Sequence, residues 1–152
     1  MSFPSRVILL LILLGRFAQG ADLISMGDWV ETIGASKLVA GAGSDLQPQI
    51  ESVSGATILT ISNAPGSWIL RARFSGTGGH PDVSVQVKRT STGSGAGRID
   101  GGTTYTELTG LDAEICSGTE SREGIALQFR LTGLSCHVSP DTYVSSIIFT
   151  VQ

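Results

Sequence analysis

The sequence has little charge and no concentration of basic residues. Asp, Glu, Lys and Arg make up 15% of its 152 residues, and the formal net charge is −3. Apart from the adjacent pair Lys88-Arg89, the cationic side chains are spaced singly, whereas proteins that bind nucleic acid or anionic lipid gather them on one face or in one run. We therefore expect no nucleic-acid partner and no charge-driven attachment to lipid.

The sequence also has no apolar run of the roughly 20 residues that a membrane-spanning helix needs. Residues 7–14 (VILLLILL) follow Arg6 and precede Ala18 and Gly20. A positive start, a short apolar run and small residues before a cleavage point are typical of a secretory signal peptide, so we expect cleavage after residue 20. Because Arg6 and Arg16 leave with residues 1–20, eight Lys and Arg face 13 Asp and Glu in the mature chain, a net charge of −5. We expect that chain to be secreted to the cell surface, the periplasm or the medium, with no membrane span.

Two cysteines and two histidines offer few ways to build a metal or nucleophile site. Cys116 and Cys136 are too few for a structural zinc site, and His137 would point to the opposite side of a strand from Cys136. We predict instead a disulfide between Cys116 and Cys136, the default in an oxidising compartment, and no metal or other cofactor. His80 and His137 also lack a nucleophile motif such as G-x-S-x-G, so no catalytic triad is indicated and we expect no enzyme.

The sequence lacks the periodicity of amphipathic helices and is rich in residues of strands and turns. Apolar and polar residues alternate over 124–132 and again over 67–75, which predicts strands with one buried face. Further strands are expected at 37–40, 48–53, 57–63, 83–88, 103–109, 113–117 and 143–152. Short strands divided by turn signals predict an all-β fold, an antiparallel two-sheet sandwich of about seven to nine strands, immunoglobulin-like or jelly-roll-like.

The sandwich domain is expected to span residues 37–152 and to have one core centred on Trp68. The other expected core residues are Leu70, Phe74, Val85, Leu127, Phe129, Ile147 and Phe149. Residues 21–36 are expected to form an N-terminal arm or edge segment, which could be a helical turn, an extra edge strand or a loose arm. Residues 91–102 are rich in Gly and Ser, so we expect an exposed loop or hairpin tip there.

Two groups of side chains could serve a ligand. Trp29 and Tyr105 are the aromatics least needed for the core and could stack on a sugar. Acidic residues recur over 100–123 and could hold Ca²⁺, or two of them, Glu107 and Glu114, could act as a hydrolase pair. A carbohydrate- or calcium-binding module is therefore one hypothesis, and a hydrolase is another.

The C-terminal stretch Pro140-Asp-Thr-Tyr143, followed by Ile147 and by Phe149-Thr150-Val151, resembles the last strand of bacterial immunoglobulin-like secreted subunits. These are the spore-coat-U and fimbrial-subunit type families. The resemblance implies a sandwich that is completed by a strand from another subunit, and an assembly on the cell surface. It covers this stretch alone and transfers no functional residue.

These patterns together predict a secreted, non-enzymatic structural or adhesion-type surface protein. We expect it to self-associate by strand addition or to bind other surface proteins, with a glycan as the alternative partner.

Overall fold

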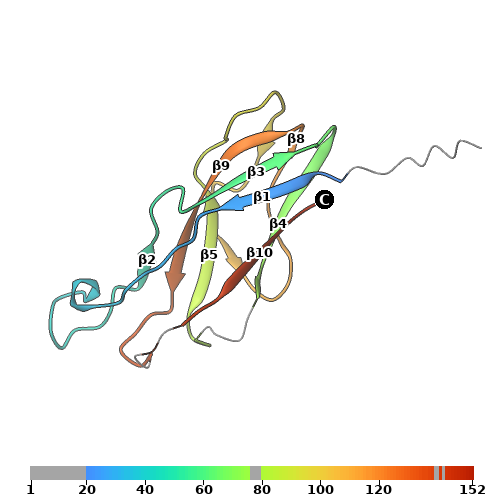
Figure 1. The fold of residues 1–152 in the computed structure, drawn as a ribbon. Helices are drawn as coiled ribbons and strands as arrows, with labels where there is room; N and C mark the ends of the chain where they lie inside the picture. The colour runs from blue at the N-terminus through green and yellow to red at the C-terminus, as the bar shows by residue number, and fades with distance from the viewer. Residues whose placement is uncertain (1–19, 76–79, 139–140, 142) are drawn as a thin grey trace, which may run out of the picture.

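The computed structural model describes residues 20–75, 80–138, 141 and 143–152. The expected signal peptide, apart from Gly20, and Pro140 lie outside the described residues. The described chain contains ten strands, one 3-10 turn at Ala35–Lys37 and no α-helix (Figure 1). The strands are β1 (Asp22–Met26), β2 (Gln49–Glu51), β3 (Thr57–Ser62), β4 (Ser67–Ser75), β5 (Ser84–Arg89), β6 (Ile99–Asp100), β7 (Thr106–Leu108), β8 (Ala113–Thr119), β9 (Arg122–Thr132) and β10 (Ser146–Val151).

The strands form two antiparallel sheets, which confirms the expected all-β sandwich. The first sheet has the order β1–β3–β9–β5–β7, and β2 pairs with the end of β9 that β3 leaves free. The second sheet has the order β10–β4–β8–β6. Residues 37–40 form no strand, because Leu38 makes only one bridge, to Leu46. Residues 21–36 contribute β1, so of the three alternatives for this segment the edge strand is the one observed.

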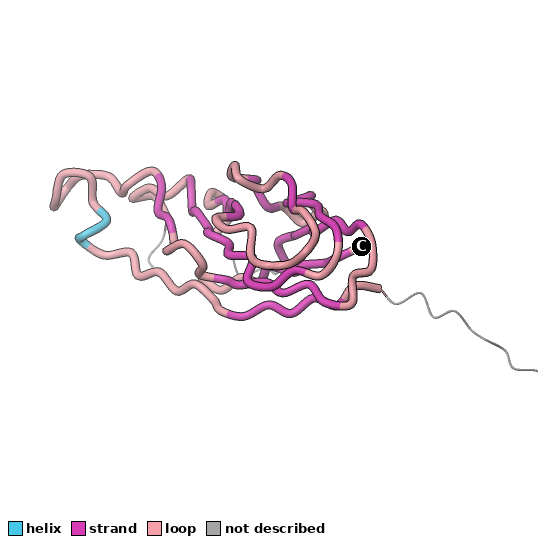
Figure 2. Tube along the Cα trace, turned by 90° about the horizontal axis from the view of Figure 1, so that it is seen from above, coloured by secondary structure: helices cyan, strands magenta, loops and turns pink. Residues whose placement is uncertain are grey.

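The pairing between strands is nested along the chain. β3 pairs with β9, β4 with β8 and β5 with β7, and successive pairs fall alternately into the two sheets. A long hairpin that is folded over itself produces this order, which is that of a jelly roll. β1 and β10 lie outside the nest. They extend the two sheets on the same side, beyond β3 and β4, and they contact each other (Figures 1 and 2).

The core lies between the inward faces of the central strands. Leu70 and Leu127 are fully buried, and Trp68 is 2% exposed. The indole N–H of Trp68 donates a hydrogen bond to the carbonyl oxygen of Glu120 at 2.8 Å, so burial leaves no polar atom of this ring unpaired. Among the other expected core residues, Phe129 is buried, and four pack half-buried against the core: Phe74, Val85, Ile147 and Phe149.

The Gly/Ser-rich loop holds more order than its composition predicts. Its residues 91–98, which we call the glycine strap, lie along the start of β9 and the end of β8. Ser94 and Glu123 exchange two backbone hydrogen bonds of 2.7 and 2.8 Å, and the N–H of Thr119 donates to the carbonyl oxygen of Arg98. A Cβ atom on Gly97 would lie 1.7 Å from the carbonyl oxygen of Thr119. Glycine here permits close contact between two backbones, so the expectation of a simple exposed loop is incomplete.

Two buried arginines fix the strap. The guanidinium of Arg89 donates to the carbonyl oxygen of Gly101 at 2.7 and 3.0 Å and to that of Ser91 at 3.2 Å. Arg122 donates to the carbonyl oxygen of Thr92 at 3.0 Å. Arg89 and Arg122 are 7% and 6% exposed. The strap is therefore part of the folded domain, because it accepts hydrogen bonds that the two buried cations need.

The predicted disulfide between Cys116 and Cys136 is wrong, because both thiols are free. Cys116 points into the core from β8, opposite Leu70 of β4, and burial raises the pKa of its thiol to about 11. Cys136 is exposed in the loop after β9, where its N–H donates to the Asp45 carboxylate at 2.9 Å. One sulfur lies inside the sandwich and the other outside it, a placement that proximity in sequence does not predict.

We expect the mature protein to contain one accessible and one protected thiol. At pH 8, a thiol reagent should modify Cys136 and leave Cys116 unmodified, since the buried Cys116 thiol stays protonated well above that pH. Both thiols should react once the protein is unfolded in guanidinium. The measurement is the mass of the labelled protein with and without denaturant. A denatured protein that takes up no label would show that the sulfurs are bonded.

Candidate functional site

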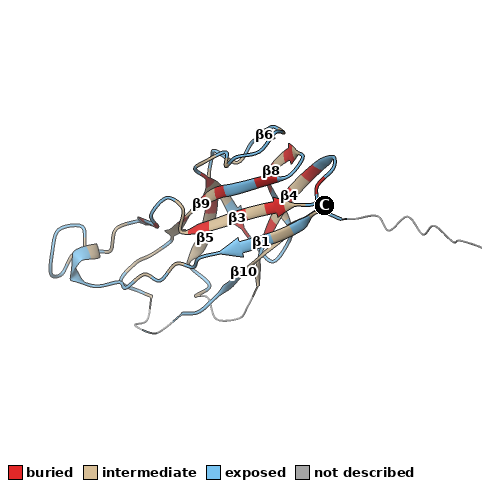
Figure 3. Cartoon of the chain, turned by 45° about the horizontal axis from the view of Figure 1, so that its top comes forward, coloured by how far each residue is buried: buried red, intermediate tan, exposed pale blue. Residues whose placement is uncertain are grey.

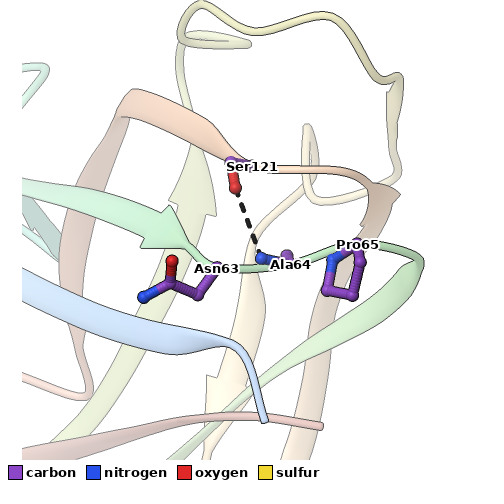
Figure 4. A pocket seen from close by; sticks show the side chains of 4 residues that line it. All are labelled: Asn63, Ala64, Pro65 and Ser121. Atoms are coloured by element: carbon purple, nitrogen blue, oxygen red, sulfur yellow. Dashed lines mark hydrogen bonds between the residues drawn. The ribbon is translucent and has the colours of Figure 1, made fainter. Parts of the chain in front are cut away.

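Two shallow pockets of about 220 and 200 Å³ lie on the described surface. The first lies where the β3–β4 turn meets the β8–β9 turn and is lined by Asn63, Ala64, Pro65 and Ser121 (Figure 4). The N–H of Ala64 donates to the Ser121 hydroxyl across this pocket, and Asn63 donates from its side chain to the Asp22 carboxylate. None of the four lining residues is an acid or a base. These two hydrogen bonds join the two turns to each other and to β1. The lining of the pocket offers no acidic or basic side chain for proton transfer.

The second pocket lies over β4, β6 and β8 and is lined in part by Arg98 and Asp100, which form an ion pair at 3.1 Å. Both side chains are more than half exposed. This is the pattern of ordinary surface charge and not of a buried reactive site.

Tyr105 lies on the outer face of the first sheet among charged side chains. The guanidinium carbon of Arg130 is 3.6 Å from the centre of its ring, and the Lys88 ammonium is 4.4 Å from it. Arg130 also donates to the side-chain oxygen of Gln49 at 2.8 Å and lies 3.9 Å from the Glu51 carboxylate. The ring that was a candidate for stacking on a sugar is thus already in contact with two cations of its own chain, which hold the β6–β7 connection against the sheet.

Tyr105 should ionise later than an ordinary tyrosine. Burial and then the Glu51 carboxylate raise its pKa to about 12, against a smaller opposing effect of Arg130. A phenol whose pKa is higher in the folded state adds stability that is complete below the unfolded pKa near 10 and is lost as pH rises towards 12. We expect the ultraviolet titration of the folded protein to contain a late step near pH 12 that Tyr105→Phe removes. A late step that persists in this variant would contradict the assignment.

Trp29 and Tyr105 are not brought together. Trp29 stacks on Phe129 with the ring centres 6.4 Å apart and an angle of 12° between the planes. Phe129 faces the core, so Trp29 covers the inner side of the first sheet, while Tyr105 lies on its outer side. The two aromatics cannot form one flat platform.

The acidic residues are also separated. Glu107 lies on β7 in the first sheet, where it accepts a hydrogen bond from Ser84 at 2.9 Å, and Glu114 lies on β8 in the second sheet. They therefore do not flank a common bond. Within the described residues, no three His, Cys, Asp or Glu side chains gather as metal ligands, and no helix has the length and apolarity to cross a membrane.

The most distinctive surface is the side of the sandwich where β1 and β10 end the two sheets, which we call the open side (Figure 1). β10 has six residues, SIIFTV, with no charge, no proline and no glycine. Edge strands are normally protected by short length, by charge, by proline or by a bulge. The edges on the opposite side, β6 and β7, follow this rule with two and three residues, whereas β10 does not.

The core is incompletely covered on the open side. Ile147, Phe149 and Val151 point inward from β10 and pack against the core, yet all three stay half-buried. By contrast, Leu70 and Ala72, their neighbours on β4, are fully buried. On β1, Leu23 faces the core and is also only half-buried. Ile24 and Met26 point to the outer face and are 54% and 70% exposed, and most of β1 has the colour of exposed residues in Figure 3. The sequence predicted a strand over residues 143–152 with Ile147 and Phe149 in the core, but not that this strand forms an edge, because its position depends on the pairing of distant strands.

Comparisons of the chain with protein-family models, with curated protein sequences and with solved structures find no match.

Proposed function

We propose that this chain is a secreted, non-enzymatic surface protein of the structural or adhesion type, which binds another protein chain by strand addition at β10. The observation that carries the proposal is the half-buried inner face of an unprotected edge strand. A strand from another chain that pairs with β10 would satisfy its unpaired backbone groups and would cover Ile147, Phe149 and Val151. Burial of apolar area contributes roughly 25 cal/mol per Å², so covering these side chains favours association.

The charges near β10 support the same proposal. Ile148 and Thr150 lie on the outer face of the second sheet, opposite Arg73 and Arg71 of β4. No charged side chain lies on β10 itself, so nothing on this strand repels an incoming strand.

The test is where the exported protein is found. A tagged full-length chain is produced in a bacterial host that exports it, and the amount on washed cells and in pelleted assemblies is compared with the amount free in the medium. We expect the unchanged chain to be mostly retained and the double variant Ile148→Glu/Thr150→Glu to be mostly free, because charge protects an edge strand.

The matched control is Val39→Glu/Val53→Glu, which makes the same change of charge at two valines that are 64% and 76% exposed and lie on loops. It should be retained like the unchanged chain. Equal retention of all three chains, or release of all three, would overturn the proposal.

A further inference from the structure

We infer that the chain which occupies the β10 edge is a second copy of this protein, paired antiparallel to β10 about a two-fold axis at Phe149. This inference rests on the proposed function and names its partner. Three features of β10 carry it: its alternation, its length and its flanking charges.

Self-pairing must keep inward residues opposite inward residues. In an antiparallel pair, residues directly opposite each other share a face of the sheet. The register centred on Phe149 places Phe149 opposite Phe149 of the second copy and Ile147 opposite Val151. All three inward apolar side chains of each copy then meet apolar side chains of the other. The two incomplete cores become continuous across the axis.

The same register uses the whole strand. It pairs residues 146–152 of one copy with residues 152–146 of the other, so no residue of β10 is left without an opposite residue. Gln152 is itself ordered, because it exchanges backbone hydrogen bonds of 2.8 and 3.1 Å with Ile69. A register shifted by two residues, centred on Ile148, would leave Val151 beyond the described strand of the second copy and would cover less of the core.

The outer face of the pair is free of like-charge contacts. Ile148 would lie opposite Thr150 of the second copy, and Ser146 opposite Gln152, all of them uncharged. The arginines on β4 lie one strand further from the axis in each copy. Like charges directly opposite each other destabilise a strand pair, and this register has none.

The contact is isologous, so it closes after two copies. A two-fold axis uses the same patch on both chains, and the β10 edge is then consumed. Any larger assembly would need a second surface, and β1, with Ile24 and Met26 exposed on it, lies on the same side. The dimer is then the unit that the cell surface retains: it presents any surface-binding site twice, so loss of β10 pairing weakens retention.

The inferred register allows a test by exchange of charge. In the Ile148→Glu/Thr150→Glu chain, each new carboxylate lies opposite an arginine of β4 within its own copy, so the fold is preserved. Across the axis, however, each carboxylate lies opposite another carboxylate. In the Ile148→Lys/Thr150→Lys chain the cross-axis charges are again alike. In a mixture of the two chains, every cross-axis pair joins opposite charges.

The experiment is sedimentation of the purified mature chains, with circular dichroism to confirm that each is folded. We expect the unchanged chain to be dimeric, each charged chain alone to be monomeric at the same loading, and the mixture to recover a dimer that contains one copy of each. The Val39→Glu/Val53→Glu chain should stay dimeric.

A second measurement covers the case in which the lysine chain folds poorly next to the arginines. In a background with Cys136→Ser, a mixture of Ile148→Cys and Thr150→Cys chains should form a disulfide between copies on mild oxidation. Opposite residues of antiparallel strands have Cα atoms about 4.5–5.5 Å apart, which is within the range that a disulfide bridges.

An unchanged chain that is monomeric when pure, or a charged mixture that recovers no dimer and no cross-link, would overturn this inference. Edge-dependent retention on the cell surface would then still support strand addition to a different chain. If the dimer is confirmed but retention on the cell surface does not depend on the β10 edge, the proposed surface role is overturned instead.

Discussion

Replacement of Gly118 by alanine is expected to lower the free energy of unfolding by about 3 kcal/mol. Gly118 lies on β8 directly opposite Trp68 of β4, on the inward face. A Cβ atom at this position would lie 2.3 Å from Cζ2 of Trp68 and 2.6 Å from the carbonyl oxygen of Arg98. The indole cannot move aside without losing its hydrogen bond to Glu120, and the carbonyl belongs to the glycine strap. The methyl group therefore pushes against two parts of a packed interior.

The measurement is a urea unfolding curve, and Gly110→Ala is the control. Gly110 lies in a turn with no atom within 4 Å of an added Cβ. We expect its effect to be within about 0.5 kcal/mol, as for other open surface positions. A Gly118→Ala chain that is as stable as the control would show that β8 does not pass so close to Trp68.

Replacement of Arg89 by methionine is expected to cost about 3 kcal/mol of stability, because two partly buried carbonyl oxygens lose the hydrogen bonds of a charged donor. Those oxygens belong to Gly101 and Ser91, at the two ends of the Gly/Ser-rich segment. Methionine fills the space of the apolar part of the Arg89 side chain but donates no hydrogen bond. We also expect faster cleavage within residues 91–98 by a protease, since the strap loses one of its two anchors.

Arg98→Met is the matched control for this change. The Arg98 side chain is 80% exposed and its ion pair with Asp100 is on the surface. Exposed pairs contribute at most about 1 kcal/mol, so this substitution should barely change the unfolding midpoint. If Arg89→Met proves as mild as Arg98→Met, the strap is not held by the buried guanidinium.

Alternation of apolar and polar residues predicted most of the sandwich. β4 has the bounds expected from the sequence, Ser67–Ser75, and β9 begins two residues earlier than expected and ends as expected. This signal is strong because each strand has one face on the core and one in water. It is weak for short strands. β6 has only two residues within a Gly/Ser-rich segment and gives no alternation to detect.

Composition proved ambiguous where glycine and cysteine were concerned. A segment rich in glycine can be a flexible linker or a backbone held close to another backbone, and Gly97 is of the second kind. Two cysteines 20 residues apart in a chain that is expected to be exported predict a disulfide, but the bond depends on which side of a strand each sulfur takes. Cys116 takes the inner side and Cys136 lies in a loop outside, so they do not meet.

The candidate site depends on topology and not on a local motif. Ile147 and Phe149 were expected in the core, but alternation cannot tell a central strand from an edge strand. The nested pairing places β4 at the limit of the jelly roll and β10 beyond it, with nothing on its other side among the described residues. The incomplete cover of this part of the core follows from that position.

Amide hydrogen exchange along β10 tests the central claim most directly. About half of the amides of an edge strand point away from its one neighbour, so they exchange rapidly unless a second chain pairs with them. We predict that alternate amides of Ser146–Val151 exchange rapidly in dilute mature protein and become protected as the protein is concentrated, while the amides of β9 remain unchanged. Amides of β10 that are equally protected at every concentration would contradict the claim that this edge is open and is taken by another chain.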